Sequence, residues 1–269
     1  MSLIKDTTTW ASDEHKMFAD STRKLFEAEM APNVDKWAEQ GIVDRAFWKT
    51  VGQQGVMGGA IAEDYGGSGG DIAFDAIAIY EQGRVGDTGW GYGIQTIVIH
   101  YINAYGSEEQ KSKWLPRLIS GDSVAAIAMT EPGTGSDLQN VQTYAEKDGN
   151  HYKINGSKIF ITNGHTADLI VVVAKTDRGA GAKGVSLIVL ETEEAEGFRR
   201  GRNLKKLGMK GSDTAELFFE NVRVPTANLL GPEEGQGFYQ LMKQLPWERL
   251  MIGITALGFI DFAIAETVK

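Results

Sequence analysis

The sequence predicts an α+β multidomain protein, in which an N-terminal all-α helical domain, a middle antiparallel β domain and the start of a C-terminal helical domain follow one another. Three observations support this prediction. Apolar residues recur at helical spacing over residues 1–124, β-branched and aromatic runs separated by glycine-rich turns fill residues 125–232, and helical spacing returns over residues 233–269. At about 150 residues per domain, a chain of 269 residues has room for more than one folding unit.

The first domain carries helix-capping signals in addition to its periodicity. Ser12 stands where an N-cap is expected, ahead of an apolar pattern that Pro32 ends. Asp71 is placed to cap a helix whose members are mostly apolar, which predicts burial on most of its sides. Ser107 and Gln110 make a capping box, so we expect another helix to begin there.

The middle domain is expected to be a small barrel or sandwich of strands joined by tight turns. Strands are predicted over residues 152–155, 158–162, 169–175, 185–191 and 215–224. Residues 179–184 match the dinucleotide-binding pattern GxGxxG, but strands lie on both sides of it and no helix follows. We therefore interpret this segment as a hairpin loop.

The last region reads as a helix over residues 238–244, a break at Pro246, and a strongly apolar helix up to Lys269. Residues 250–265 are too few to cross a membrane, which takes about 20 apolar residues, so a buried core helix is the favoured interpretation.

Composition excludes several classes of protein and of site. The formal net charge of −9 disfavours nucleic-acid binding, and the absence of cysteine excludes disulfides and thiolate metal sites. The four histidines show no ligand spacing, so no metal site is expected. The first ten residues have no apolar signal core, and we expect a cytoplasmic protein without a membrane span.

Three segments carry groups suited to chemistry. Residues 127–137 have glycines at alternate positions near Thr130 and Ser136, which suits close approach to a planar heterocycle or a phosphate, although a strand followed by a Pro-Gly turn explains the same letters. In residues 158–164, Phe160 and Thr162 alternate and so share one face of a strand, which by itself is an ordinary strand before an Asn-Gly turn.

The third segment is Leu245-Pro-Trp-Glu-Arg249. A carboxylate flanked by proline, tryptophan and leucine is poorly solvated, and burial would raise its pKa toward the range of a general base. The alternative is a solvated helix start in which Glu248 and Arg249 pair at the surface.

Six ordered segments together resemble the acyl-CoA dehydrogenase family over almost the whole chain. They are Tyr65-Gly-Gly-Ser-Gly, Tyr105-Gly-Ser-Glu-Glu-Gln-Lys followed by Trp114-Leu-Pro, Ala128-Met-Thr-Glu-Pro-Gly-Thr-Gly-Ser-Asp137, Phe160-Ile-Thr-Asn-Gly164, Lys210-Gly-Ser-Asp-Thr-Ala-Glu-Leu-Phe-Phe-Glu-Asn-Val-Arg-Val-Pro225 and Gly235-Gln-Gly-Phe-Tyr239. The resemblance implies a helical domain, a β domain and a C-terminal four-helix bundle, with FAD held between them and across a subunit interface.

The resemblance also implies roles for individual residues. The residues expected to contact FAD are Ile127, Ala128, Met129, Thr130, Gly135, Ser136, Phe160, Ile161 and Thr162, with phenylalanine at 160 where tryptophan is more usual. The residues expected to contact acyl-CoA are Ser136, Tyr239, Pro246, Trp247 and Arg249. Glu248 stands where the long-chain and isovaleryl branches place their catalytic base, and the surrounding letters are especially similar to the long-chain branch.

The activity so implied is that of a flavoprotein oxidoreductase of fatty acid β-oxidation, which removes an α-proton and a β-hydride from an acyl-CoA and passes the electrons to an electron-transferring flavoprotein. We expect a homodimer or homotetramer. The resemblance further implies a truncated chain that lacks on the order of a hundred residues of the bundle. An acyl-CoA oxidase and a non-catalytic fragment that binds acyl-CoA or FAD remain the alternatives.

Overall fold

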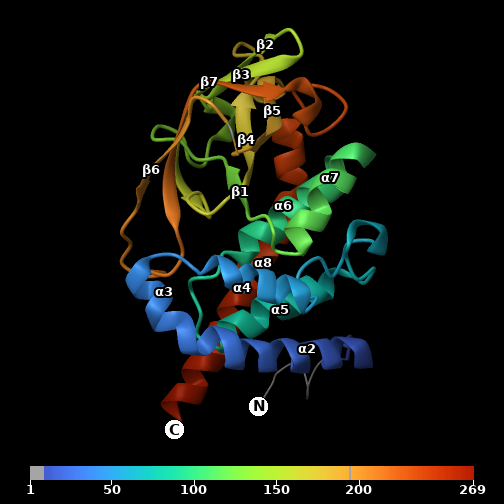
Figure 1. The fold of residues 1–269 in the computed structure, drawn as a ribbon, viewed down its shortest axis with the longest axis vertical. Coiled ribbons are helices and arrows are strands. Elements are labelled where there is room, and N and C mark those ends of the chain that lie inside the picture. The colour runs from blue at the N-terminus through green and yellow to red at the C-terminus, as the bar shows by residue number, and fades with distance from the viewer. Residues whose placement is uncertain (1–8, 194) are drawn as a thin grey trace.

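The computed structural model describes residues 9–193 and 195–269, and its elements follow the predicted order of helices, strands and helix (Figure 1). The helices of the first domain are α2 Asp13–Leu25, α3 Val34–Gln40, α4 Arg45–Gln53, α5 Ile72–Arg84, α6 Tyr92–Tyr105 and α7 Glu108–Ile119. The strands are β1 Ala125–Ala128, β2 Tyr144–Asp148, β3 His151–Thr162, β4 Leu169–Lys175, β5 Val185–Glu191, β6 Phe198–Asn203 and β7 Thr214–Pro225, and helix α8 covers Gly237–Thr267. The predicted caps at Ser12, Asp71 and Ser107 are confirmed by hydrogen bonds from His15, Ala73 and Gln110 backbone amides.

The middle domain is a seven-stranded sheet that is mixed and not purely antiparallel. Strand β1 pairs in parallel with β4, from Ala125 opposite Leu169 to Ala128 opposite Val172, while β4 and β5 form the expected antiparallel hairpin around residues 179–184. Parallel neighbours need a long crossover, and residues 129–168, which include β2 and β3, supply it. Every residue of β4 is buried, so this strand forms the centre of the sheet.

Helix α8 differs from its prediction in being continuous through Pro246. Proline removes the hydrogen bond to the carbonyl of Met242. Both residues are exposed, so water can satisfy that carbonyl without ending the helix.

The first half of α8 lies against the sheet and the second half packs on α5 (Figure 1). A Cβ atom at Gly83 would lie 3.0 Å from the Cα atom of Gly258, so this pair of glycines allows the two helices to touch. The Tyr80 hydroxyl also donates a hydrogen bond to Asp261.

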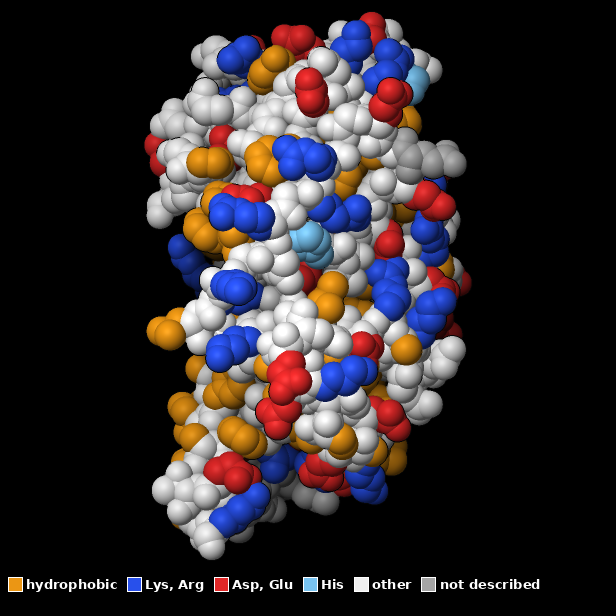
Figure 2. Space-filling view, turned by 60° about the vertical axis from the view of Figure 1, so that its left-hand side comes forward, with side chains coloured by type: hydrophobic (Ala, Val, Ile, Leu, Met, Phe, Trp, Pro, Cys, Tyr) orange, Lys and Arg blue, Asp and Glu red, His pale blue; other side chains and the backbone are white. Residues whose placement is uncertain are grey.

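The other side of α8 is exposed, contrary to the expectation of a buried core helix. Figure 2 shows hydrophobic side chains gathered along its lower part, and the exposed large ones include Leu250, Ile252, Leu257, Ile260 and Ile264. By length and composition α8 is the one described helix that could span a membrane. Only 11% of its most apolar 18-residue stretch is buried inside the protein.

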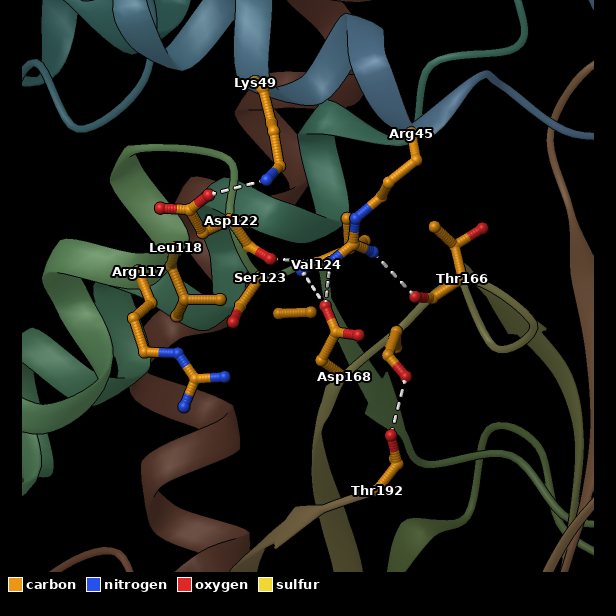
Figure 3. Close-up of polar contacts among 12 residues, drawn as sticks. Arg45, Lys49, Arg117, Leu118, Asp122, Ser123, Val124, Thr166, Asp168 and Thr192 are labelled. Atoms are coloured by element: carbon orange, nitrogen blue, oxygen red, sulfur yellow. Dashed lines mark hydrogen bonds and ion pairs between the residues drawn. The ribbon is translucent and has the colours of Figure 1, made fainter.

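Arg45 joins the helical domain to the sheet (Figure 3). Its guanidinium donates hydrogen bonds to the carbonyls of Asp122 and Thr166, at 2.8 and 3.0 Å, and pairs with the carboxylate of Asp168. Asp168 also accepts a hydrogen bond from the amide of Val124 at the start of β1. These contacts fix α4 relative to the first and fourth strands.

Candidate active site

An apolar cavity of about 230 Å³ lies where α5, α6 and α8 meet the sheet. Most of its wall is hydrophobic, and the lining includes Ile79, Ile94, Ile97, Trp90, Met209, Met251, Ile252 and Phe259. Glu248 and Thr162, which lie far apart in the sequence, both line it. The cavity therefore places a candidate base and a candidate cofactor contact in one apolar enclosure.

The carboxylate of Glu248 is half-buried on the side of α8 that faces α6. Its Oε1 atom accepts a hydrogen bond from the hydroxyl of Tyr101 at 2.8 Å. Burial raises the pKa of the Glu248 carboxyl above its ordinary range, and the Tyr101 hydrogen bond acts in the opposite direction. Among the described residues Glu248 has no ion pair with Arg249, so the alternative of a surface pair is not what the structure contains.

The segment after β1 is tied to β3 by a buried ion pair. The ammonium of Lys158 donates hydrogen bonds to the carbonyl of Met129 and to the carboxylate of Glu131, both at 2.9 Å, and both side chains are almost fully buried. The amide of Ile159 adds a hydrogen bond to the carbonyl of Thr130 at 3.0 Å.

The same carboxylate also orders the residues that precede β2. Glu131 accepts hydrogen bonds from the amides of Gln142 and Thr143, at 2.5 and 2.8 Å. Burial lowers the pKa of Lys158 to about 8 despite the opposing effect of Glu131, and the pKa of Glu131 is lowered chiefly by Lys158, against desolvation. Each partner thus offsets part of the cost of burying the other.

The end of β3 departs from the regular alternation that the sequence predicts. The pairing of β3 with β7 shifts register between Lys158 and Ile161, and Phe160 has a φ of +60°, in the left-handed region that non-glycine residues rarely adopt. Its ring is 63% exposed, Ile161 is buried, and Thr162 lines the cavity. At this bulge Phe160 is therefore exposed to solvent, whereas Thr162 faces the cavity.

The remaining residues expected to contact FAD fall into a buried strand and an exposed loop. Ile127 and Ala128 are buried in β1, and Met129 and Thr130 are half-buried after it. Gly135 and Ser136 are exposed, and a Cβ atom added at Gly135 would meet nothing within 4 Å. The loop surface at these two positions is thus open to a ligand.

Four residues of α8 were expected to contact acyl-CoA, and three of them are accessible. Tyr239, Pro246 and Arg249 are exposed, whereas Trp247 is buried and its ring lies 5.7 Å from that of His100 on α6. Trp247 thus belongs to the contact between α6 and α8.

Asp87 shapes the cavity wall that precedes α6. Its carboxylate accepts hydrogen bonds from the amides of Gly89 and Trp90, both at 2.9 Å, and from the side chain of Gln82 at 2.8 Å. Burial raises the pKa of this carboxyl, while those hydrogen bonds act against the rise. Because its carboxylate accepts three hydrogen bonds that hold this loop, Asp87 has a structural role.

A second, larger cavity of about 460 Å³ is polar and is lined by Arg117, Ser123, Asp168 and Thr192, among others (Figure 3). Its lining contains none of the residues that were expected to contact FAD or acyl-CoA. In the described part of the chain no group of three or more histidine, aspartate or glutamate side chains could hold a metal ion.

Sequence reasoning missed Tyr101, Lys158 and Glu131. Tyr101 lies within a largely apolar helix, and a polar group at a buried position of such an element is the signal that could have identified it.

Comparison with known proteins gives a consistent result. Residues 12–122 match the acyl-CoA dehydrogenase N-terminal domain and residues 126–222 match the middle domain. The chain is 48% identical to the long-chain specific acyl-CoA dehydrogenase of Sus scrofa over 259 residues, which is 95% of this chain and 60% of that protein. The chain thus spans less than two thirds of the length of this curated relative.

Solved structures agree with the sequence matches. An acyl-CoA dehydrogenase from Geobacillus kaustophilus superposes with a TM-score of 0.90 at 47% identity, over 94% of this chain and 67% of that one. A glutaryl-CoA dehydrogenase from Mycobacterium smegmatis, solved in complex with FADH2, superposes with a TM-score of 0.88 at 31% identity, over 98% and 66% of the two chains.

Proposed function

Because the chain belongs to the acyl-CoA dehydrogenase family, we propose that it catalyses the FAD-dependent α,β-dehydrogenation of an acyl-CoA thioester to a trans-2-enoyl-CoA. The observation that carries this proposal is the shared cavity, in which burial raises the pKa of Glu248 opposite the end of β3. A base with a raised pKa takes a proton more readily than an ordinary carboxylate.

The residues at the end of β3 fit a flat heterocycle such as the isoalloxazine of FAD. The ring of Phe160 offers an exposed aromatic surface, Thr162 is half-buried and lines the cavity, and half-buried Thr130 is bonded through its carbonyl to the amide of Ile159. A residue held at positive φ needs surroundings that fix it, and the Lys158–Glu131 pair lies two residues away. FAD, when bound, supplies the acceptor for the β-hydride.

The protein's own residues have three tasks in this reaction. Glu248 takes the α-proton of the thioester. The aliphatic and aromatic side chains of the cavity exclude water around the acyl chain, which strengthens electrostatic interactions at the reacting carbons. Ser136, Tyr239, Pro246 and Arg249 are exposed and offer the accessible groups with which the CoA moiety would interact, and Trp247 packs against His100 between α8 and α6.

Replacement of Glu248 by glutamine tests the proposed base. In the FAD-reconstituted protein, Glu248→Gln should bind acyl-CoA with nearly unchanged affinity but lose the bleaching of the flavin absorbance on mixing with substrate, because an amide cannot accept the proton. The matched control is Glu266→Gln at the far end of the same helix, where the carboxylate pairs with Lys269 at the surface. Bleaching of Glu248→Gln at the wild-type rate would contradict the assignment.

Electron transfer to an electron-transferring flavoprotein, assembly as a homodimer or homotetramer, and a cytoplasmic location are parts of the same proposal. The alternative is an acyl-CoA oxidase, in which oxygen accepts the electrons of the reduced flavin. Stoichiometric hydrogen peroxide formation during turnover would identify it. A colourless protein that cannot be reconstituted with FAD would favour the third possibility, a non-catalytic binding module.

A further inference from the structure

The hydroxyl of Tyr101 makes the single hydrogen bond that the structure gives to the Glu248 carboxylate from the described residues. Tyr101 lies in the middle of α6 with its ring fully buried, and its partner lies on α8, 147 positions further along the chain. Oε1 of Glu248 is the acceptor, and no hydrogen bond from the described residues reaches Oε2.

Tyr101 is itself fixed by its neighbours on α6. Its ring packs edge-on against that of Tyr105, at 5.9 Å between ring centroids, and the hydroxyl of Tyr105 donates to the backbone carbonyl of Gln240 on α8 at 3.2 Å. His100, on the same helix, contacts the ring of Trp247. Tyr105 and His100 therefore contact α8 at Gln240 and Trp247, whereas the Tyr101 hydroxyl contacts the Glu248 carboxylate itself.

We propose that Tyr101 is a positioning residue for the Glu248 base. Its hydroxyl fixes the carboxylate rotamer in the cavity and stabilises the charged form that must be present before the substrate proton is taken. This inference rests on the proposed function, since it assigns a partner to the base of that reaction. Hydrogen bonds to charged groups are stronger than those between neutral ones, so the loss of this one should be measurable.

The other charged groups near the Glu248 carboxylate are bonded elsewhere or exposed, so Tyr101 is its hydrogen-bond partner. On α6, His100 is bonded to the buried carboxylate of Asp75 from α5, at 2.8 Å. Asp87, in the loop before α6, is bonded to its own loop, and Arg249 on α8 is exposed. Burial and the nearby Glu248 charge raise the pKa of Tyr101 far above neutrality, so it remains a proton donor across the working range.

The test compares Tyr101→Phe with Tyr105→Phe, a matched removal of one hydroxyl from the next turn of the same helix. For Tyr101→Phe we expect kcat to fall about 10- to 100-fold, because the carboxylate is no longer held in the reacting rotamer, with KM within about two-fold of the wild-type value. The acid limb of the pH profile should also move to higher pH. Tyr105→Phe should leave the acid limb unchanged.

A second readout does not depend on turnover. The carboxyl of Glu248 can be titrated by carbon NMR in the flavin-free chain, with Glu248→Gln used to assign the signal. Its pKa should rise in Tyr101→Phe and stay at the wild-type value in Tyr105→Phe. An unchanged pKa in Tyr101→Phe overturns the positioning role and leaves the base assignment intact, whereas flavin bleaching by Glu248→Gln overturns the base itself.

If Tyr101→Phe fails to fold, 3-fluorotyrosine at position 101 keeps the ring and the hydroxyl. Fluorine makes the phenol a stronger donor, so the pKa of Glu248 should then fall below the wild-type value. A pKa of Glu248 that does not respond to the fluorine contradicts the proposal.

Discussion

The two parts of the candidate site are held in different ways. On the sheet side, the segment after β1 is fixed by the buried Lys158–Glu131 ion pair and by four further hydrogen bonds, two to the carboxylate of Glu131 and two to the backbone carbonyls of Met129 and Thr130. On the helix side, Glu248 depends on one hydroxyl from α6, and α8 leaves much of its apolar surface exposed. The segment after β1 is thus organised within the sheet domain, whereas the position of Glu248 depends on how one helix packs against α6.

The largest effect is expected from breaking the sheet side. Lys158→Met leaves the Glu131 carboxylate buried without its partner, and such a loss costs about 3–5 kcal/mol of the free energy of unfolding. Urea unfolding followed by far-ultraviolet circular dichroism measures it, and FAD affinity should fall with it.

The matched control is Lys175→Met, a second buried lysine, whose ammonium donates to the carbonyl of Gly181. It should be less destabilising because no buried carboxylate depends on it among the described ion pairs. The double variant Lys158→Met/Glu131→Gln should recover part of the loss. Equal destabilisation by Lys158→Met and Lys175→Met would show that the ion pair has no special role.

A smaller effect is expected on the helix side from Glu248→Asp. The charge is retained, but the carboxylate moves back by one methylene and can no longer reach both Tyr101 and the cavity. A misplacement of about 1 Å typically lowers the rate about 100-fold, and the free energy of unfolding should change little. Stopped-flow flavin bleaching gives the rate, with Glu266→Asp as the control. A rate within two-fold of wild type would mean that the position of the carboxylate is not critical.

The joint between the two domains should be less sensitive still. Arg45→Met removes hydrogen bonds to two backbone carbonyls and the ion pair to Asp168, and we expect a loss of about 1–2 kcal/mol because the pair is partly exposed. Lys49→Met breaks a pair with Asp122 in which both side chains are more than half exposed, so its thermal midpoint should stay near that of wild type. A larger loss of stability in Lys49→Met than in Arg45→Met would contradict the role of Arg45.

The smallest effect is a dependence of stability on pH. Because the pKa of Glu248 is raised above the ordinary 4.5, the folded protein binds more protons than the unfolded chain from pH 4.5 up to that raised value. The contribution of this group to stability is therefore full at low pH and falls as pH rises through the window. Glu248→Gln should unfold at a higher temperature than wild type at pH 7, and the difference should narrow below pH 4.5. A difference in unfolding temperature that does not change with pH would exclude the raised pKa of Glu248 as its cause.

The sequence was sufficient for those features that local chemistry decides. The caps at Ser12, Asp71 and Ser107 are local hydrogen bonds, and the hairpin at residues 179–184 follows from turn residues between two strands. The fold class follows from periodicity and is confirmed, with a mixed sheet in place of the antiparallel one.

Features set by distant contacts were not predictable in the same way. The parallel pairing of β1 with β4 depends on a crossover of some forty residues, and the positive φ of Phe160 occurs where the pairing of β3 with β7 shifts register. Likewise, the motif placed Glu248, but its partner Tyr101 comes from a helix that only the tertiary fold brings alongside.

The most direct test of the central claim uses an acyl-CoA analogue with sulfur in place of the β-carbon. Such a thioester can lose its α-proton but has no β-hydride to transfer, so a long-wavelength absorbance band with bound FAD reports proton removal alone. The FAD-loaded protein should develop this band, with a pH dependence set by Glu248, and Glu248→Gln should bind the analogue without developing it. A band of equal intensity in Glu248→Gln would contradict the assignment of Glu248 as the base.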